Sequence, residues 1–520
     1  MIHPSCMAEG RLADILADYA RRKRIFLLSE VLAEADRKNT IPETAAALWP
    51  QFTALDLVTE RVPGDLRLWQ KAPSAPRIIT PDERIRLEAF FGDPELPSWI
   101  SDAILDYIQI KTGKAWDDPG VLQKVQRAIV SQKDEYWKEG QKKRISYKKG
   151  YSVLGYLAYQ ALVYILQAEH ILFELALAGL LKKSMRILDL GTGPGIVPLA
   201  IVDFLGRIGG CTADIYSVEQ SEEFIEAFRF LAGTKVPGGD SITIHPPLQS
   251  DLSTVPPYDL PPSLDLIVFQ NVLNEMTGLT VPEKGGLVRE CAKALSSDGS
   301  IILVEPADMV NSMDLRRVAH NAAGEGLFIH APCRFLWGTR CNPEQCWSFV
   351  KKPPIRQTSL MEMLSRGDEG FRYRNTDIKY SYSLLRKGPP PPIRGLPLSP
   401  RRYARLSMLE RHINRKINVA AVVMSGNLGD RRTYVYRICD GTTKRPVYAV
   451  LLAYHRSIEN KELLSLPYGS IATFTSVLVR FNPKYKAYNL LVTRDSRVGL
   501  LSMENAGGHA RGRRSKGKKG

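Results

Sequence analysis

The sequence has no run of about eighteen consecutive apolar residues, so we expect no transmembrane helix. Its most apolar stretch, residues 153–181, is interrupted by Gln, Glu and His side chains, which predicts a buried or amphipathic helix instead. The first residues also lack an apolar signal core and include Glu9, Asp14 and Asp18. Neither a secretory signal nor an acid-poor organellar signal fits this pattern, so we expect a cytoplasmic protein with no membrane partner.

Cysteine is scarce, with seven residues among 520, yet Cys333, Cys341 and Cys346 fall within fourteen positions. In a cytoplasmic protein this clustering favours a metal site over disulfides, because the compartment keeps thiols reduced. Three thiolates are one short of the usual four ligands, and Cys439 and His330 are both candidates for the fourth. The remaining cysteines are expected to be buried or incidental thiols: Cys6, Cys211 and Cys291.

The sequence has fewer acidic than basic residues: it contains 55 Asp and Glu and 71 Lys and Arg, which gives a net charge of +16. This sign favours RNA or DNA as a partner over an acidic membrane; the alternative is a basic surface without such a partner. Two basic segments are candidates for phosphate contacts, with a solvated helix face and a solubilising tail as the respective alternatives. Their basic residues are Lys142, Lys143, Arg144, Lys148 and Lys149 in the first segment, and Arg511, Arg513, Arg514, Lys516, Lys518 and Lys519 in the second.

The length predicts several domains, because a single hydrophobic core stops growing well below 520 residues. Residues 1–150 have mostly helical apolar spacing and predict a helical N-terminal region. Residues 151–330 then alternate short β-rich runs with helices, which predicts an α/β domain with a parallel sheet. The other divisions are a cysteine segment with a closing strand at 331–387, a stiff proline-rich linker at 388–402, a β-domain at 403–503 and a disordered basic tail at 504–520.

The predicted β-domain contains five strand candidates separated by turn residues, between residues 417 and 493. Five short strands favour a small OB-like β-barrel, a frequent nucleic-acid-binding scaffold. The alternative is a small β-domain of unrelated topology, since counting strands does not fix how they pair.

A glycine-rich turn, RILDLGTGPGIV, follows the first strand candidate of the α/β region and opens a helix. Gly191, Gly193 and Gly195 permit a tight turn and a close approach between the backbone and a ligand. Dinucleotide sites use similar glycines, but Asp189 and the GxGxG spacing resemble motif I of class I S-adenosylmethionine (SAM) methyltransferases. The resemblance implies a Rossmann-like domain with SAM as its cofactor.

Two acidic residues near the ends of the next two strand candidates are suited to bind the ribose and the adenine of SAM. Glu219 ends the second strand candidate, where a carboxylate hydrogen-bonds ribose hydroxyls in related folds. Asp251 follows the third strand candidate and is either a contact for the adenine amine or an ordinary loop carboxylate. We therefore expect both carboxylates in the cofactor region.

The segment after the fourth strand candidate reads QNVLNEM and lacks the NPPY-type loop of many base-amine methyltransferases. Asn271, Asn274 and Glu275 are its polar candidates for positions near a transferred methyl group, and the alternative for them is helix capping. The sequence thus predicts SAM binding more firmly than methyl transfer.

Several motifs together resemble the methyltransferase-like assembly factors of the small ribosomal subunit, a family best known from mitochondria with bacterial and archaeal members. They are GTGPG, AYQALVYILQAEHIL before it, VEP, APC followed by two cysteines in a CWSF setting, and SYSLLRK. The resemblance covers about residues 150–387. It implies a [4Fe-4S] cluster on Cys333, Cys341 and Cys346, with Cys439 as the distal ligand. The run RFLWGTR departs from the family pattern and keeps Zn open as the alternative metal.

These observations predict a SAM-binding, metal-cluster protein that acts in ribosome assembly or translation by binding small-subunit rRNA, and that methylates it or uses SAM as a structural ligand. A methyltransferase acting on tRNA or a ribosomal protein is one alternative. A non-catalytic RNA-binding assembly factor is another, although the intact Asp189 and glycines argue against it. If Cys439 is a ligand, the metal joins the cysteine segment to the β-domain.

Overall fold

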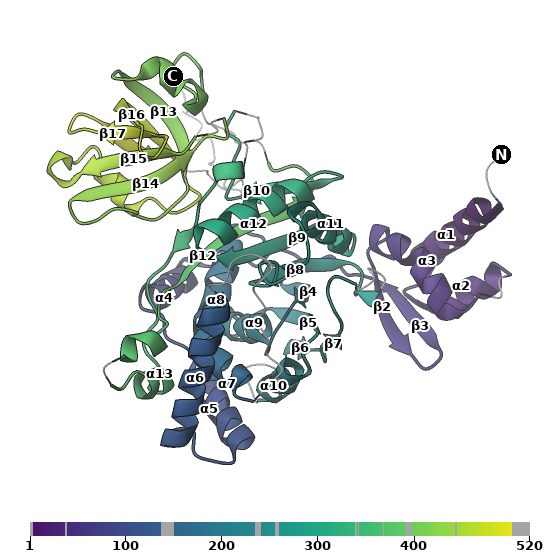
Figure 1. Cartoon of the computed structure of the whole chain (residues 1–520). Helices are drawn as coiled ribbons and strands as arrows, with labels where there is room; N and C mark the ends of the chain where they lie inside the picture. Colours follow the sequence, from purple (N-terminus) through teal and green to yellow (C-terminus); the bar gives the residue numbers. More distant parts are fainter. Residues whose placement is uncertain are drawn as a thin grey trace, which may run out of the picture.

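A computed structural model of the chain describes residues 4–36, 39–136, 150–234, 241–254, 259–337, 341, 343–367, 369–391, 398–442 and 445–501. Figure 1 shows a central α/β domain with an N-terminal lobe on one side and a β-barrel on the other. The barrel, in yellow-green, lies beside α12 and β12, and the lobe, in purple, lies beyond β8 and β9.

The central sheet has nine strands, and its main path runs in the order β10-β12-β9-β8-β4-β5-β6. The five strands from β9 to β6 run parallel, whereas β12 runs antiparallel to its neighbours β9 and β10. Because β12 lies inside the sheet, the domain closes at Lys387, later than the boundary of 330 that the sequence indicated. The strands are β4 Ser184–Leu190, β5 Thr212–Glu219, β6 Ile242–Ile244, β7 Leu248–Gln249, β8 Leu264–Gln270, β9 Leu295–Pro306, β10 Leu327–Ala331, β11 Val350–Lys351 and β12 Lys379–Lys387.

Both faces of the sheet are covered, which is why its strands read as nearly continuous apolar runs. In β8, Leu266 and Val268 join one hydrophobic core, and Ile267 and Phe269 join the other. The first core contains α4–α10 and α13, and the second contains α11, α12 and the N-terminal lobe. The helices are α4 Pro81–Gly92, α5 Ser98–Thr112, α6 Pro119–Tyr136, α9 Ile196–Ile208, α10 Glu222–Ala232, α11 Val281–Ala292, α12 Met309–Ala322 and α13 Ser359–Leu364.

The apolar stretch before β4 forms one long helix made of α7 (Ser152–Tyr156), a π-helical turn (Leu157–Ala161) and α8 (Leu162–Leu177). By length and composition it is the one helix among the described residues that could cross a membrane. However, 78% of its most apolar window is buried inside the protein. It is packed as a core helix against α9, as the interruptions in its sequence predicted.

The N-terminal lobe contains α1 (Pro4–Arg22), α2 (Leu28–Glu34) and α3 (Ile41–Ala54). Beside these helices it has a three-stranded antiparallel sheet, so the prediction of a purely helical region is wrong for this part. The strands are β1 Ile25–Leu27, β2 Leu57–Val62 and β3 Asp65–Gln70, in the order β1-β3-β2. Their polar alternation, as in LVTERV, hides them from a search for apolar runs.

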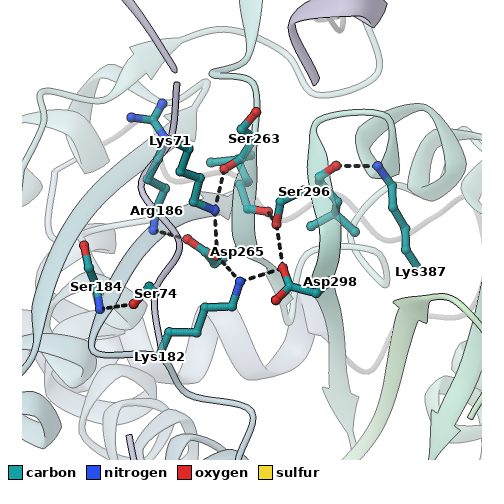
Figure 2. Close-up of polar contacts among 12 residues, drawn as sticks. Lys71, Ser74, Lys182, Ser184, Arg186, Ser263, Asp265, Ser296, Asp298 and Lys387 are labelled. Atoms are coloured by element: carbon teal, nitrogen blue, oxygen red, sulfur yellow. Dashed lines mark hydrogen bonds and ion pairs between the residues drawn. The ribbon is translucent and has the colours of Figure 1, made fainter. Parts of the chain in front are cut away.

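The segment after β3 attaches this lobe to the amino ends of the central strands. Lys71 and Lys182 both donate from Nζ to Oδ1 of Asp265, at 2.7 and 2.6 Å. Lys182 also contacts Asp298 at 2.6 Å, as Figure 2 shows. Asp265 is 4% exposed and each lysine is 13% exposed, so these three charges are largely shielded from water, whereas Asp298 is 57% exposed.

The C-terminal domain is a closed barrel whose strands are ordered β13-β14-β15-β17-β16, with β13 also paired to β16 and with β18 beside β16. β15 and β17 pair in parallel, and the other neighbours pair antiparallel. This order and the single parallel pair give the OB-like barrel that the sequence predicted. The strands are β13 Lys416–Val423, β14 Thr433–Cys439, β15 Val447–Leu452, β16 Ile471–Asn482, β17 Ala487–Val492 and β18 Arg497–Leu500.

The barrel packs on the cysteine segment between β10 and β12. The indole Nε1 of Trp337 donates to Oδ2 of Asp440 at 3.0 Å, and Arg437 donates to the carbonyl oxygen of Gln345 at 2.7 Å. Phe349 also forms a parallel β-bridge with Ser425. The cysteine segment therefore lies at the junction of the two domains.

Candidate cofactor and metal sites

The turn from β4 to α9 contains three glycines with positive φ, and each faces different surroundings. A Cβ at Gly191 would collide with the side chain of Val272, and one at Gly195 would lie 2.9 Å from Cδ2 of Phe228. A Cβ at Gly193 would meet nothing within 4 Å, and Gly193 lines an open cavity. Two glycines thus allow close packing, whereas Gly193 leaves space for a ligand.

Glu219, the last residue of β5, holds this turn in place. Its Oε2 accepts a hydrogen bond from the backbone of Gly193 at 2.9 Å. Its Oε1 accepts from the backbone of Gln220 and Ser221 at 2.9 and 2.8 Å. Burial raises the pKa of Glu219, while these three donors lower it. The carboxylate lines the cavity, and its remaining lone pairs suit donors such as ribose hydroxyls.

Directly after β8, Asn271 is a polar residue in a strained position. Its φ is 56°, in the left-handed region that non-glycine residues seldom adopt. It is 9% exposed, and neither Oδ1 nor Nδ2 has a hydrogen-bond partner within the described part of the chain. An unpaired buried polar atom costs about 1–3 kcal/mol, so a strained and unpaired amide indicates a position prepared for a ligand.

These groups line a cavity of about 370 Å³ at the carboxyl ends of β4, β5 and β8, where α/β folds bind ligands. Its wall also includes Tyr156 and Phe224, which sequence reasoning missed because aromatic residues on helices resemble core residues. Asp251 lies on the wall, and its Oδ1 also accepts hydrogen bonds from Ser253. The predicted site residues on this wall are Gly191, Gly193, Glu219, Asp251, Asn271 and Glu275.

Two predicted residues lie behind the wall. Asp189 is 1% exposed, its Oδ2 has no partner in the described structure, and burial raises its pKa to about 7. Asn274 donates from its side chain and its backbone to the buried carboxylate of Glu305, whose pKa burial also raises to about 7. Asn274 therefore binds Glu305 and is not on the cavity wall, unlike Asn271 and Glu275.

The structure brings the four candidate cysteine ligands to one location. Cys333, Cys341 and Cys346 lie between β10 and β11, and Cys439 ends β14 of the barrel. Burial raises the pKa of Cys333 to about 11 and that of Cys341 to about 12. Burial also raises the pKa of Cys439 well above its usual value, and charges on the other three thiols raise it further. Cys333 and Cys439 both pack against one small apolar cluster at the domain junction, which includes Leu336 and Met424.

The rival ligand His330 points elsewhere, because its Nε2 lies 3.0 Å from the carbonyl oxygen of Gly388. His320 on α12, which the sequence did not single out, lies 3.6 Å from Sγ of Cys341. Across the described residues, no three His, Cys, Asp or Glu side chains form a group that could hold a metal ion.

The other cysteines take no part in this group. Cys211 and Cys291 are buried elsewhere, at 5% and 3% exposure, as predicted for incidental thiols. The side chain of Cys6 lies outside the described residues, as do all the basic residues predicted to contact RNA in segments 142–149 and 511–519.

The barrel offers a basic and aromatic turn that strand counting missed, between β16 and β17. Tyr485 is 65% exposed there, with Lys484 Nζ 5.3 Å from its ring centre and Lys486 on its other side in sequence. At the same end, Arg445 lies 5.3 Å from the ring centre of Phe481. In OB folds the corresponding loop between the fourth and fifth strands contacts oligonucleotides.

Comparison with protein families finds one match, over residues 407–501 of the barrel. The family is described as the C-terminal domain of DUF8157, a domain of unknown function. A search of curated proteins finds no match.

Solved structures similar to this chain include several described as methyltransferases. Magnesium protoporphyrin IX methyltransferase from Synechocystis is 12% identical with a TM-score of 0.28, covering 50% of this chain and 94% of its own. A SAM-dependent methyltransferase from Leishmania major is 15% identical with a TM-score of 0.28, covering 62% and 99%. The YcgJ protein from Bacillus subtilis is 16% identical with a TM-score of 0.26, covering 43% and 98%.

The fold class follows from the strand order of the central sheet. The short strands β7 and β11 lie off the main path. When the other seven strands are renumbered from 1 to 7 along the chain, their order from β6 to β10 is 3-2-1-4-5-7-6. The seventh strand, β12, runs antiparallel to both of its neighbours. A Rossmann-like core with this closing strand is the class I SAM-methyltransferase fold, followed here by an OB-like barrel.

Proposed function

We propose that the protein binds SAM in the cavity at the ends of β4, β5 and β8 and transfers its methyl group. The observation that carries this proposal is the combination of an open glycine cradle at Gly193 with the unpaired, strained amide of Asn271 across the cavity. A bound SAM supplies an electrophilic methyl group on a sulfonium. The chain's own residues then have to hold the cofactor and orient the acceptor.

Each wall residue has a role in that arrangement. Glu219 accepts hydrogen bonds from the ribose hydroxyls, and Asp251 lies where the adenine amine is expected. Asn271 offers both a donor and an acceptor, so it orients the nucleophilic nitrogen or oxygen of the acceptor. Glu275 lies on the wall and is exposed, and it accepts the proton that the acceptor loses.

Two measurements test this function. Calorimetry should detect SAM binding, and Glu219→Gln should weaken it, while Asn321→Ala on the exposed side of α12 should not. Transfer of a labelled methyl group to small ribosomal subunits, to tRNA and to ribosomal proteins then separates the acceptors. Measurable SAM binding without incorporation into any of them would leave SAM as a structural ligand and reject the enzyme.

We further propose that Cys333, Cys341, Cys346 and Cys439 hold a [4Fe-4S] cluster, with Zn as the alternative. Support comes from the burial of Cys346, the partly buried positions of Cys333, Cys341 and Cys439, and the apolar side chains packed beside Cys333 and Cys439, which include Leu336 and Met424. A cluster with these ligands would fasten the barrel to the central domain, because one ligand comes from β14. Metal binding of this kind contributes directly to folding free energy.

Anaerobic purification followed by iron and sulfide analysis tests the cluster. Cys439→Ser should lower iron and sulfide together and should make the barrel easier to release by limited proteolysis. Cys291→Ala, at a buried thiol outside the set, is the matched control and should keep the wild-type content. A colourless protein with one Zn would replace the cluster by the alternative metal.

We propose small-subunit rRNA as the partner, and a role in ribosome assembly or translation. The resemblance of residues 150–387 to ribosomal assembly factors supports this partner, and so do the net charge of +16 and the basic turn of the barrel. Crosslinking to ribosomal RNA in cell extracts tests it. Crosslinks to tRNA alone would favour the tRNA methyltransferase, and RNA binding without methyl transfer would favour a non-catalytic factor.

A further inference from the structure

A second cavity, the lobe cavity, lies between the N-terminal lobe and the central domain, where the end of α3, the end of α11 and the start of β10 meet. Its volume is about 340 Å³, within the range of about 300–1,000 Å³ that is usual for small-molecule sites. Lys387, the last residue of β12, lies on its wall and donates to the carbonyl oxygen of Leu295, where β9 begins (right of Figure 2). The lobe cavity is therefore at the amino ends of the parallel strands, opposite to the proposed SAM site.

Three cations line the lobe cavity: Arg289, Lys293 and Lys387. Arg289 donates to the carbonyl oxygen of Asn321, and neither it nor Lys387 has an ion-pair partner within 4 Å in the described part of the chain. Lys293 pairs with Glu290 at 2.6 Å, but both side chains are more than half exposed, and such surface pairs contribute little to stability. The positive charges on this wall are thus largely free to bind a ligand.

Thr53 of α3 lies on the same wall, and its hydroxyl group is unused. The residue is 6% exposed, and within the described residues its Oγ1 has no hydrogen-bond partner. A threonine inside a helix commonly donates to the carbonyl oxygen four residues earlier, and Thr44 of the same helix does so to Thr40 at 2.9 Å. Because an unpaired buried polar atom is costly, the hydroxyl of Thr53 indicates a hydrogen bond that a ligand completes.

The charges on the wall favour an anion. Its one carboxylate among the described residues is Glu325, which is exposed, and Asp56 interacts with Lys387 without lining the cavity. The planar fork of donors on a guanidinium matches the oxygens of a phosphate, and an ammonium and a hydroxyl add single donors to them. Pro50 and Leu327 give the remaining wall an apolar character, which suits the carbon part of a phosphorylated molecule.

We propose that the lobe cavity binds a phosphate group, held by Arg289, Lys387 and the hydroxyl of Thr53. Because the lobe cavity and the SAM cavity lie at opposite ends of the parallel strands, the two ligands do not compete. The inference therefore does not depend on methyl transfer or on a metal. A phosphate bound here contacts both the lobe and the central domain, and if it belongs to RNA, the N-terminal lobe is part of the RNA-binding surface.

Calorimetry on the full-length protein, in a buffer without phosphate or sulfate, tests three sources of the group: inorganic phosphate, ribose 5-phosphate and a short single-stranded RNA. Ribose 5-phosphate has no base, so it does not report on the adenine region of the SAM cavity. Arg289→Gln combined with Lys387→Gln should weaken binding of the source that the wild type takes by ~10-fold or more, because it removes two charged hydrogen-bond donors. The source with the highest affinity identifies the natural carrier of the phosphate.

Arg84→Gln combined with Lys111→Gln is the matched control, because it removes one arginine and one lysine from α4 and α5 and should leave binding unchanged. Thr53→Val keeps the shape of the side chain and decides the question if the double variant is insoluble. It should lower phosphate affinity by about 2- to 10-fold without lowering the urea midpoint of the free protein, because the hydroxyl has no partner to lose. The proposal is overturned if the wild type binds none of the three sources, if the control loses as much affinity as the double variant, or if Thr53→Val lowers the midpoint and leaves affinity unchanged.

Discussion

Gly193 and Gly195 both have positive φ and lie two residues apart, but a methyl group would affect them differently. Gly193→Ala places its methyl in the open cavity, so we expect weaker SAM binding with a modest loss of stability, about 1 kcal/mol from the backbone. Gly195→Ala places its methyl against Phe228, so we expect a larger loss of folding stability. Thermal unfolding with and without SAM measures both effects, and equal behaviour of the two variants would contradict the assignment of Gly193 to the ligand.

The ionisation of the buried Asp189 carboxyl should make the affinity for SAM depend on pH. This carboxyl has a pKa of about 7 in the ligand-free protein, so it gains its charge as the pH rises through that value. SAM carries a positive sulfonium, and an ionised Asp189 favours it. We therefore expect affinity to increase from pH 6 to pH 8, by at most about tenfold per pH unit for one coupled proton. Asp189→Asn should flatten this dependence in calorimetry, and an equally steep profile in the variant would assign the proton to another group.

The same carboxyl has the opposite effect on folding without ligand. The unfolded chain loses this proton near pH ~4, whereas the folded protein keeps it up to about pH 7. Between these values the folded state binds more protons, so its free energy of unfolding falls as the pH rises. Asp189 thus stabilises the ligand complex at a cost to the free protein, which is typical of functional residues.

At the scale of elements, the ion cluster of Figure 2 determines how firmly the N-terminal lobe is attached to the central sheet. Asp265→Asn leaves Lys71 and Lys182 without their shared anion, and breaking a shielded ion pair on one side costs about 3–5 kcal/mol. We expect a clear drop in the urea midpoint and faster proteolysis after β3. Glu88→Gln removes an exposed partner of Arg84 and should change stability by less than about 1 kcal/mol. Equal urea midpoints for Asp265→Asn and Glu88→Gln would contradict a stabilising role of the ion cluster.

The parallel strands and the glycine turn could be predicted from the sequence because their signals are local. A strand such as LDLIVFQ is buried on both faces, and motif I places its glycines within a single turn. The position of β12 inside the sheet depends on pairing with β9 and β10, which lie far from it in sequence. The buried Arg316 of α12 reads as an ordinary helix-surface arginine, because its serine partners follow 32 to 67 residues later.

At the scale of the whole molecule, the cavity and the cysteines have separate positions. The cavity lies at the carboxyl ends of β4, β5 and β8, and the cysteines lie past β10, at the far edge of the sheet beside the barrel. A metal at the second position therefore does not contact a ligand in the first. If the proposed metal is bound, it would hold the barrel in a fixed orientation, and RNA bound on the barrel would then be presented to the central domain at a constant angle.

The barrel turn between β16 and β17 gives the last prediction, on RNA binding. Each phosphate contact contributes about 0.7 to the slope of log affinity against log salt for single strands, so Lys484→Gln with Lys486→Gln should lower the slope by about 1.4. Tyr485→Ala should weaken binding by about 1–3 kcal/mol through lost base stacking and should leave the slope unchanged. Deleting residues 507–520 should lower the slope further if the tail contacts phosphates.

The control for this series removes two lysines from the helical region instead, with Lys114→Gln and Lys124→Gln. The net charge then falls equally, so a general effect of charge would reduce the slope as much as the barrel variant does. A specific RNA surface predicts a smaller change in the control, because Lys124 is on α6 and Lys114 is in the turn between α5 and α6, and Figure 1 shows these helices away from the barrel. Equal slopes in the two double variants would assign RNA affinity to the overall charge of the molecule and remove the turn from the binding surface.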